Sequence, residues 1–389
     1  MAKFAIITIP FFGHINTTIS VGQELINRGH SVAWITAKPM RGLNIPNKGH
    51  FFITNQENKE VEILLEKVKN GKNRAGLKGV RYITEDVLIP LNKLMYEGLV
   101  GIVEGYKPDL IIHDEQTYAG AICAYQLGIP YATTYSVPSG IFESLEISPL
   151  KNWYFSGLLA LQKSLGVEYE GIISHSKKLG LVFCPKNFNN LQDLMPSQKF
   201  VGPCIDIARI HAANFDFSLI QKEKKHILVS IGTLLDGEAE RFFNIIVEDF
   251  KDSPYQIIVS AKPHLFRNWP SNFIVQENLP QLEILKQVDA VITHGGANTV
   301  CESVGMGKPM VVLPMAFDQY HLAEQIQESH IGLRLKYKRL SPNDMKNACD
   351  EVLNPANIYM QNVKILAESF KSGGGARQAA NYLENLIVQ

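Results

Sequence analysis

The residues Phe4-Ala5-Ile6-Ile7-Thr8-Ile9 form a continuous, mostly apolar run near the start of the chain. A run of this kind, without polar alternation, predicts a β-strand that is buried on both faces. The turn Pro10–His14 follows, and apolar side chains then recur at helical spacing from Ile15 to Gly29, a residue that commonly ends helices. Residues 31–36 form the next apolar run. This strand–helix–strand order predicts a parallel sheet covered by helices.

The second half of the chain repeats this organisation. Residues 109–114, a helix that carries a cysteine, and residues 128–133 correspond to residues 289–294, another cysteine-bearing helix, and residues 307–312. We therefore expect an α/β protein with two doubly wound parallel sheets that face a cleft, with ligands at the C-terminal ends of the strands. The charged run 222–225 lies close to the boundary, and the predicted domains are residues 1–215 and 216–369.

The composition argues against several classes of protein. The 389 residues carry 38 Lys and Arg against 38 Asp and Glu, and this zero net charge argues against a general nucleic-acid-binding protein. The five cysteines form neither a CxxC pair nor a cluster with histidine, which indicates reduced thiols in a cytoplasmic protein. The chain begins without a signal-peptide pattern, and no apolar run reaches the roughly 18 residues that a membrane span needs.

The strongest chemical signal follows the predicted strand at residues 290–293. The motif His294-Gly295-Gly296-Ala297-Asn298-Thr299 places two glycines directly before a predicted helix. Glycines let the backbone approach a ligand closely, and the free N–H groups at a helix N-terminus favour an anion. Glu302, one turn into the helix, can accept hydrogen bonds from a diol such as ribose. The motif predicts a nucleotide-diphosphate site, and the alternative is a tight turn in which Asn298 only caps the helix.

These residues resemble the family-1 glycosyltransferases, the UDP-glycosyltransferase superfamily, and the resemblance extends over essentially the whole chain. The segment from Leu279-Pro280-Gln281 to Gln319 is similar to the nucleotide-sugar signature of that family, and residues 314–319 are similar to its bacterial macrolide and carotenoid members. The resemblance implies a GT-B fold of two Rossmann-like domains, with residues 370–389 forming a helix that packs back on the first domain.

The resemblance also implies roles for the residues that match the motifs of the family. His14 matches a catalytic base, and Asp114 matches an acidic partner that would fix the imidazole tautomer and stabilise the imidazolium. Without the resemblance, each of the two could be a structural turn residue. The residues that would hold the base, ribose, diphosphate and sugar of the donor are Ser230, Gly232, Thr233, Gln281, His294, Gly296, Asn298, Thr299, Glu302, Asp318 and Gln319.

One position departs from the pattern of the family. Asn278 stands where many members have a tryptophan that stacks on uracil, so UDP-sugars and dTDP-sugars are both expected donors, with glucose as the expected sugar. The sequence lacks the Asp-x-Asp motif that holds a metal–diphosphate complex. We therefore expect no metal and no cofactor besides the nucleotide sugar.

Acceptor binding is expected in the first domain, at residues 57–100 and 136–170. The candidate contacts are Phe12, Phe142, Trp153 and Tyr154, although aromatic side chains of this kind could instead form ordinary core. The prediction is an inverting, metal-independent glycosyltransferase that acts on a hydroxyl of a hydrophobic small molecule. A nucleotide-sugar epimerase and a non-catalytic auxiliary partner are the alternatives. Ser136 and Ser139 lack the G-x-S-x-G pattern, so a hydrolase is not expected.

A basic segment lies at residues 66–81, with six basic side chains and one acidic side chain. A solvated loop is the plain interpretation. The sharper hypothesis is a weak peripheral contact with anionic lipid, at the inner face of the membrane, because each basic residue near such a surface contributes about 1 kcal/mol.

Overall fold

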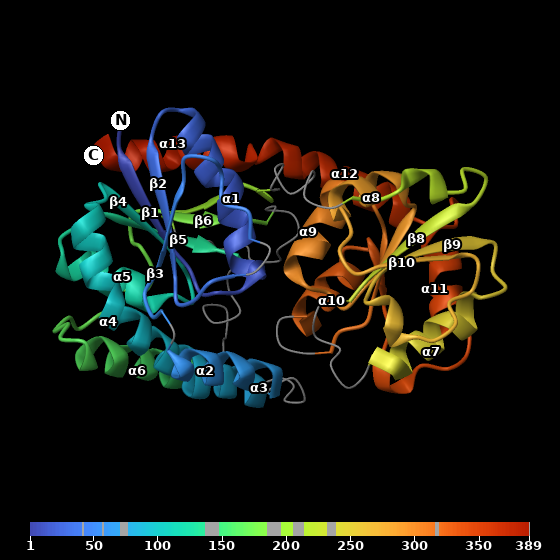
Figure 1. Cartoon of the computed structure of the whole chain (residues 1–389), viewed down its shortest axis with the longest axis horizontal. Coiled ribbons are helices and arrows are strands. Elements are labelled where there is room, and N and C mark those ends of the chain that lie inside the picture. The colour runs from blue at the N-terminus through green and yellow to red at the C-terminus, as the bar shows by residue number, and fades with distance from the viewer. Residues whose placement is uncertain are drawn as a thin grey trace. The chain divides into compact units, whose positions relative to one another are not determined.

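The computed structural model describes residues 1–40, 43–56, 58–70, 77–136, 148–184, 196–204, 214–231, 239–315 and 319–388. The chain divides into two compact units, the first made of Met1–Asp206 with Ser372–Gln389 and the second of Ile207–Lys371. Each unit has its own sheet (Figure 1). Each also has its own hydrophobic core. The domain ranges predicted from the sequence, 1–215, 216–369 and 370–389, stay predictions.

The first unit is built on a seven-stranded sheet with the order β3-β2-β1-β4-β5-β6-β7. Its strands are β1 (Lys3–Ile7), β2 (Ser31–Thr36), β3 (His50–Ile53), β4 (Leu110–Asp114), β5 (Tyr131–Tyr135), β6 (Gly180–Val182) and β7 (Gln198–Phe200), and all of them pair in parallel. The strand order reverses between β1 and β4. The C-terminal ends of these two strands therefore form a topological switch point, where ligands commonly bind in such sheets.

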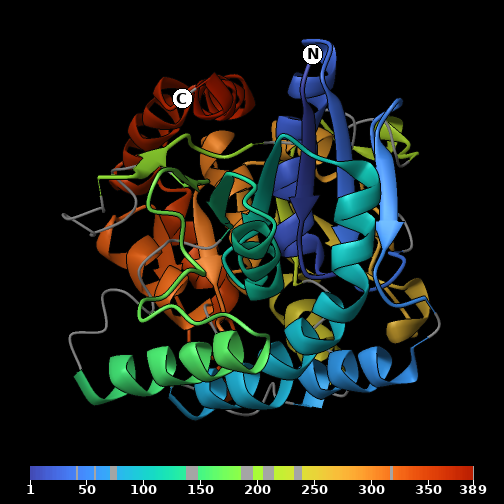
Figure 2. The same ribbon diagram turned by 90° about the vertical axis from the view of Figure 1, so that its left-hand side faces the viewer.

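Helices cover both faces of this sheet (Figure 2). They are α1 (Phe12–Asn27), α2 (Lys59–Asn70), α3 (Leu77–Ile83), the π-helical stretch η2 (Thr84–Leu88), α4 (Ile89–Tyr106), α5 (Tyr118–Gln126), α6 (Ser148–Ser164) and α13 (Gly375–Val388). Successive residues of β1 point to opposite faces, as a strand requires. Ala5 and Ile7 join the core formed with α4 and α5, whereas Phe4 and Ile6 join the core formed with α1 and α13.

The second unit has a six-stranded sheet with the order β10-β9-β8-β11-β12-β13. Its strands are β8 (Lys225–Ser230), β9 (Tyr255–Ser260), β10 (Phe273–Gln276), β11 (Ala290–Thr293), β12 (Met310–Val312) and β13 (Gly332–Arg334), again all parallel. The order reverses between β8 and β11, so this sheet repeats the switch point of the first. The predicted pair of doubly wound sheets is confirmed.

The helices of the second unit follow the apolar periodicity of the sequence. They are α7 (Ala239–Phe250), α8 (Gln281–Gln287), α9 (Ala297–Gly305), α10 (Gln319–Glu328), α11 (Asp344–Val352) and α12 (Tyr359–Ser372), with 3₁₀ turns at η5 (Phe217–Leu219), η7 (Pro263–Leu265) and η8 (Tyr337–Arg339). Phe242, Phe243, Ile246 and Phe250 form the buried stripe of α7. In the described part of the chain, no helix is both long enough and apolar enough to cross a membrane.

Candidate active site

The structure brings together the two residues predicted to carry the catalytic chemistry. His14 lies in the first turn of α1, directly after β1, and Asp114 is the last residue of β4. Because β1 and β4 are neighbours in the sheet, the two side chains meet at the switch point, with His14 Nδ1 at 2.9 Å from Asp114 Oδ2. The carboxylate is 1% exposed and the imidazole 12%.

The partners of Asp114 determine the tautomer of His14. A carboxylate can only accept hydrogen bonds, so the hydrogen of the neutral imidazole lies on Nδ1 and Nε2 keeps its lone pair. Asp114 Oδ1 accepts a hydrogen bond from the backbone N–H of Gln116 at 3.0 Å, and Oδ2 accepts another from the Ser136 hydroxyl at 3.2 Å. The hydrogen bonds to the Asp114 carboxylate therefore compensate for its burial. In this tautomer, Nε2 is the ring nitrogen of His14 that can take a proton from a substrate.

The neighbouring His113 is not part of this pair. Its side chain lies on the opposite face of β4, where Nε2 contacts the Thr133 hydroxyl at 2.9 Å and Nδ1 contacts the carbonyl oxygen of Asp114 at 3.0 Å. Complete burial lowers the pKa of His113 to about 4, so this imidazole is neutral at physiological pH. Its hydrogen bond to Thr133 connects β4 to β5 on the face of the sheet opposite to His14.

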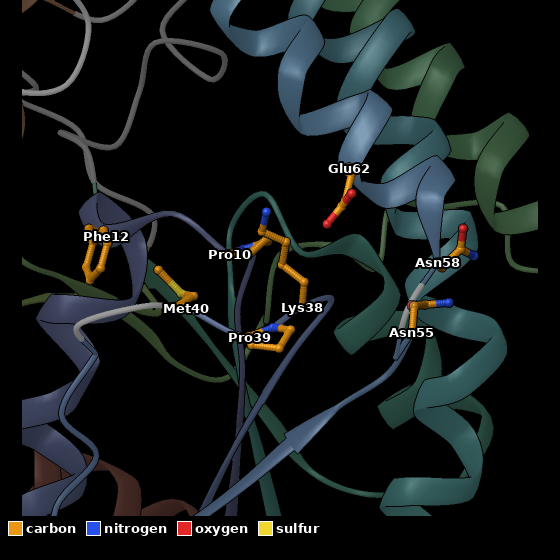
Figure 3. A pocket seen from close by; sticks show the side chains of 8 residues that line it. All are labelled: Pro10, Phe12, Lys38, Pro39, Met40, Asn55, Asn58 and Glu62. Carbon is orange, nitrogen blue, oxygen red and sulfur yellow. The ribbon is translucent and has the colours of Figure 1, made fainter.

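A cavity of about 470 Å³ opens near the C-terminal ends of the first three strands (Figure 3). The residues that line it come from the segments after β1, β2 and β3 and from α1 and α2: Pro10, Phe12, Lys38, Pro39, Met40, Asn55, Asn58 and Glu62. Figure 3 shows the Glu62 carboxylate pointing from α2 toward Lys38 on the opposite wall. Neither side chain makes an ion pair or hydrogen bond within the part of the chain that the structure describes. The cavity therefore combines apolar surface with two charged groups that remain available to a ligand.

The aromatic residues predicted for acceptor binding lie in different surroundings. Phe12 lines the cavity and is 46% exposed. Tyr154, on α6, is 3% exposed and bonds through its hydroxyl to Tyr118 at 3.1 Å. Trp153 packs against the same core and donates its indole N–H to Glu85 at 2.6 Å. Tyr154 is thus part of the core, and Trp153 packs against that core as a partly buried side chain. Phe142 lies outside the described residues.

The second unit gathers several predicted donor-binding residues at its own switch point. Ser230 ends β8, Gln281 begins α8, and Glu302 lies on α9. The Ser230 hydroxyl donates to Gln281 Oε1 at 3.0 Å, and Gln281 Nε2 donates to Glu302 Oε2 at 2.6 Å. The same amide lies 3.4 Å from the Thr299 hydroxyl. These groups form one polar cluster that can exchange its internal hydrogen bonds for bonds to a ligand.

Two glycines shape the turn between β11 and α9. Gly295 has φ +88°, and a Cβ at this position would lie 2.9 Å from Val312 Cγ1. A Cβ on Gly296, the residue that caps α9, would lie 2.8 Å from His294 Nε2. The first turn of α9, which includes Asn298 and Thr299, directly follows Gly295 and Gly296. The free N–H groups of such a turn favour an anion.

Two further predicted residues are buried beside this turn. His294 is 8% exposed, and burial lowers its pKa to about 4, so the imidazole is neutral. Its Nδ1 has no hydrogen-bond partner among the described residues. Gln319, the first residue of α10, is 2% exposed and accepts a hydrogen bond from the Met315 N–H at 2.9 Å. Gly232, Thr233 and Asp318 lie outside the described residues.

Several residues at these sites are not among those that the sequence predicts. The sequence offers Ser136 only as a possible hydrolase nucleophile, although its position directly after β5 places it at the same sheet edge as Asp114. Asn58 and Glu62 lie within the range 57–100 predicted for acceptor binding, but the sequence does not single them out. Lys38 and Asn55 lie in connections outside the predicted ranges, where polar residues carry no periodicity. Among the described residues, no group of three or more His, Cys, Asp or Glu side chains could hold a metal ion. All five cysteines are free thiols, and four of them are buried.

Comparison with known proteins adds evidence from the whole chain. The family model described as "UDP-glucoronosyl and UDP-glucosyl transferase" matches residues 181–372. The NDP-glycosyltransferase YjiC of Bacillus subtilis is 27% identical, over 99% of this chain and 97% of its own length. Among solved structures, the glycosyltransferase of kitacinnamycin has a TM-score of 0.79 and 22% identity, with 99% of both chains covered. The spinosyn rhamnosyltransferase SpnG, complexed with thymidine diphosphate, has a TM-score of 0.74 and 14% identity, covering 98% of this chain and all of its own.

The two structural likenesses show the fold, and it is the GT-B fold of glycosyltransferases. The family model and the relative that is similar over its whole length add evidence on the activity. The chain is a glycosyltransferase, and its residues 181–372 match the model of the UDP-glycosyltransferase family.

Proposed function

We propose that this protein transfers a sugar, with inversion at the anomeric carbon, from a nucleoside-diphosphate sugar to a hydroxyl of a small natural-product-like acceptor. The observation that carries the proposal is the His14–Asp114 pair at the switch point of the first unit, with Nδ1 of His14 at 2.9 Å from Oδ2 of Asp114. A base held in this way suits a direct displacement, because the acceptor oxygen must lose its proton as it attacks.

In the proposed reaction, Nε2 of His14 takes the proton of the acceptor hydroxyl. The acceptor oxygen forms a bond to the anomeric carbon while the bond from that carbon to the diphosphate oxygen breaks. Asp114 stabilises the imidazolium that results, without itself being protonated. A single displacement at the anomeric carbon inverts its configuration.

We assign the donor to the polar cluster of the second unit. The amide of Gln281 and the carboxylate of Glu302 provide the donor and acceptor groups that a ribose diol needs. The first turn of α9 and the glycines before it suit the diphosphate, whose charge is stabilised by fixed backbone N–H groups. The proposal therefore needs no metal ion, and a chelator such as EDTA is expected to leave the rate of transfer unchanged.

Two features support an assignment of substrates. The solved relatives named for kitacinnamycin and spinosyn, the second with bound thymidine diphosphate, favour a natural-product acceptor and keep dTDP beside UDP as a donor. The cavity beside Phe12 offers Pro10, Pro39 and Met40 to an apolar body, and Lys38 and Glu62 to polar groups. We propose an acceptor with an apolar face and a polar edge, and glucose as the sugar.

The substitution His14→Ala tests the proposal. It removes the base, so sugar transfer should fall by about 10²–10⁴-fold, the usual contribution of a positioned general base. UDP binding, measured by calorimetry, should stay within about twofold, because the donor cluster lies in the other unit. His30→Ala is a matched control, since His30 is engaged with Glu384 at the C-terminal helix. Undiminished transfer by His14→Ala would overturn the assignment of the base.

The same assay separates the alternative activities. Release of UDP is measured with and without a panel of hydroxylated acceptors. A transferase releases UDP in step with glycosylated product, an epimerase releases it without any acceptor, and an auxiliary protein releases none.

We further propose a cytoplasmic location, with residues 66–81 as a weak peripheral contact to anionic lipid. Within this segment Arg81 is already paired with Glu85 at 3.1 Å, so the other basic residues of the segment would carry the contact. Binding to anionic liposomes that weakens as salt rises would support this contact, and the absence of binding at low salt would refute it.

A further inference from the structure

Ser136 is the third member of the cluster around His14. It follows β5 directly, is 6% exposed, and lies beside β4 in the sheet, where Asp114 pairs with Thr134. Its hydroxyl oxygen is 2.8 Å from His14 Nδ1 and 3.2 Å from Asp114 Oδ2. All three side chains are therefore within hydrogen-bonding distance of one another.

This serine, histidine and aspartate do not form the arrangement of a hydrolase. In a hydrolytic triad the serine and the carboxylate bind opposite nitrogens of the imidazole, so that the histidine can take the proton of the serine. Here Ser136 and Asp114 approach the same nitrogen, Nδ1. Nδ1 is already protonated when it faces the carboxylate, so the ring nitrogen that contacts Ser136 has no lone pair with which to activate it.

The positions of the hydrogens follow from the same contacts. The Nδ1–H of His14 is shared between Asp114 Oδ2 and the oxygen of Ser136, at 2.9 and 2.8 Å. The single hydrogen of the hydroxyl then points to Asp114 Oδ2. Ser136 thus accepts from the imidazole and donates to the carboxylate, which closes a ring of three hydrogen bonds.

The second hydrogen-bond partner of Nδ1, Ser136, restricts the orientation of the His14 ring. His14 lies in the first turn of α1, whose N-cap residue Phe11 makes no side-chain hydrogen bond, and the terminal torsion of an imidazole is broad. One bond to Asp114 leaves the ring able to pivot about that bond. The contact with Ser136 fixes the ring plane and hence the direction in which the Nε2 lone pair points.

We propose that Ser136 is a positioning residue for sugar transfer, which holds His14 and Asp114 in the geometry that directs Nε2 at the acceptor hydroxyl. The proposal rests on the function proposed above, because the orientation of the ring matters only if His14 is the base. Ser136 takes no part in bond making or breaking.

The test is a kinetic comparison of Ser136→Ala, Ser136→Cys and Ser136→Thr. Loss of one hydrogen bond to a charged group usually reduces a rate by about 10-fold or more, so Ala and Cys should lower kcat by about that factor. The KM for the acceptor and the Kd for UDP should stay within twofold. Thr keeps the hydroxyl and should restore most of the activity. Ser174→Ala is the control, because Ser174 is a serine of the same unit that is also buried, at 2% exposed, but lies outside this cluster.

A spectroscopic readout separates positioning from stability. The ¹⁵N resonances of His14, assigned by comparison with His14→Ala, report which ring nitrogen carries the hydrogen. The Nδ1–H form should dominate in the wild type, and Ser136→Ala should broaden or mix the signals although its melting temperature stays close to that of the control. Unchanged kcat and unchanged signals in Ser136→Ala would overturn the proposal, as would failure of Thr to rescue. If His14→Ala is fully active, the proposed base fails first, which is a distinguishable result.

Discussion

Two buried carboxylates, one in each unit, differ in the partners that hold them. Asp114 is bound by an imidazole, a hydroxyl and a backbone N–H, so its partners orient a base. Glu302 is 6% exposed, and the amide of Gln281 donates to it at 2.6 Å. A buried carboxylate is costly unless it is hydrogen-bonded, and an amide that can turn away is replaceable by a ligand hydroxyl. The local partners thus favour a catalytic use for Asp114 and a binding use for Glu302.

The binding use of Glu302 leads to a prediction for nucleotide affinity. Glu302→Ala removes the charged acceptor that we propose for the ribose hydroxyls, and hydrogen bonds to charged groups contribute roughly 1.5–3 kcal/mol. We expect the Kd for UDP, measured by calorimetry, to rise by about 10–100-fold. Glu283→Ala, on the neighbouring helix α8, is the control and should bind UDP as the wild type does. Equal affinities for the two variants would remove Glu302 from the donor site.

Among the elements, helix α13 is joined to the first unit by a compact set of charged contacts. Arg28, at the end of α1, donates to Glu384 at 2.6 Å and to Asn381 at 2.8 Å. His30 contacts the other oxygen of Glu384 at 2.8 Å. Below these contacts, Ala379, Ala380 and Leu383 are completely buried. The apolar face supplies most of the attachment, and the charged groups fix the position of the helix along α1.

These contacts predict a dependence of stability on pH. Burial alone would raise the pKa of Glu384, but the hydrogen bonds from His30 and Arg28 outweigh it, so this pKa lies below its ordinary value of 4.5. A carboxylate with a lowered pKa stabilises the folded state above the ordinary value, and this stability is lost as the pH falls through the folded pKa. Glu384→Gln should therefore lower the melting temperature at pH 7 by about 2 °C, since partly exposed pairs contribute up to about 1 kcal/mol.

The difference between wild type and Glu384→Gln should shrink as the pH falls below the ordinary value of 4.5 and vanish below the folded pKa, where Glu384 is protonated in both states of the wild type. Glu368→Gln is the control, since its pair with Lys371 is largely exposed and its loss should change the melting temperature little at any pH. A difference that stays constant from pH 7 to pH 3 would contradict the assigned pairing.

The elements also show what periodicity can and cannot predict. The apolar runs at β1, β2, β4 and β11 predict these strands close to their observed limits, because a strand buried on both faces has a distinctive composition. The strands β6, β7 and β13 have three residues each, too few to show a period, and were missed. For Trp153 and Tyr154 the sequence leaves a binding site and ordinary core both open, because hydrophobicity alone cannot distinguish a helix face that packs on a core from one that lines a cavity.

For the candidate site, the sequence points to individual residues but not to all of their contacts. His14, Asp114, Gln281 and Glu302 were found from motifs, and the structure brings the first pair and the second pair into contact. The part played by Ser136 could not be predicted, because its contacts depend on the lateral order of β1, β4 and β5. That order is a property of the sheet and leaves no mark on the spacing of residues along the chain.

At the scale of the whole molecule, the chain is two units that repeat one design. Each sheet reverses its strand order once, and a polar cluster of the same unit lies at each of these switch points. Each unit also has its own hydrophobic core. A ligand that binds one cluster should therefore stabilise one unit directly, by an amount set by its concentration and affinity.

This separation predicts how UDP changes the unfolding of the protein. At 100 times its Kd, UDP should stabilise the second unit by about 2.7 kcal/mol, which corresponds to a rise of about 5–11 °C in its melting temperature. Hydrogen exchange with mass spectrometry should show slower exchange in β8, β11 and α9, and unchanged exchange in the core strands β1 and β2. His14→Ala should respond as the wild type does, whereas Glu302→Ala should need a higher concentration of UDP for the same effect. Equal protection of both cores would mean that the nucleotide is also held by the first unit, and the assignment of its site to the Gln281–Glu302 cluster would have to be abandoned.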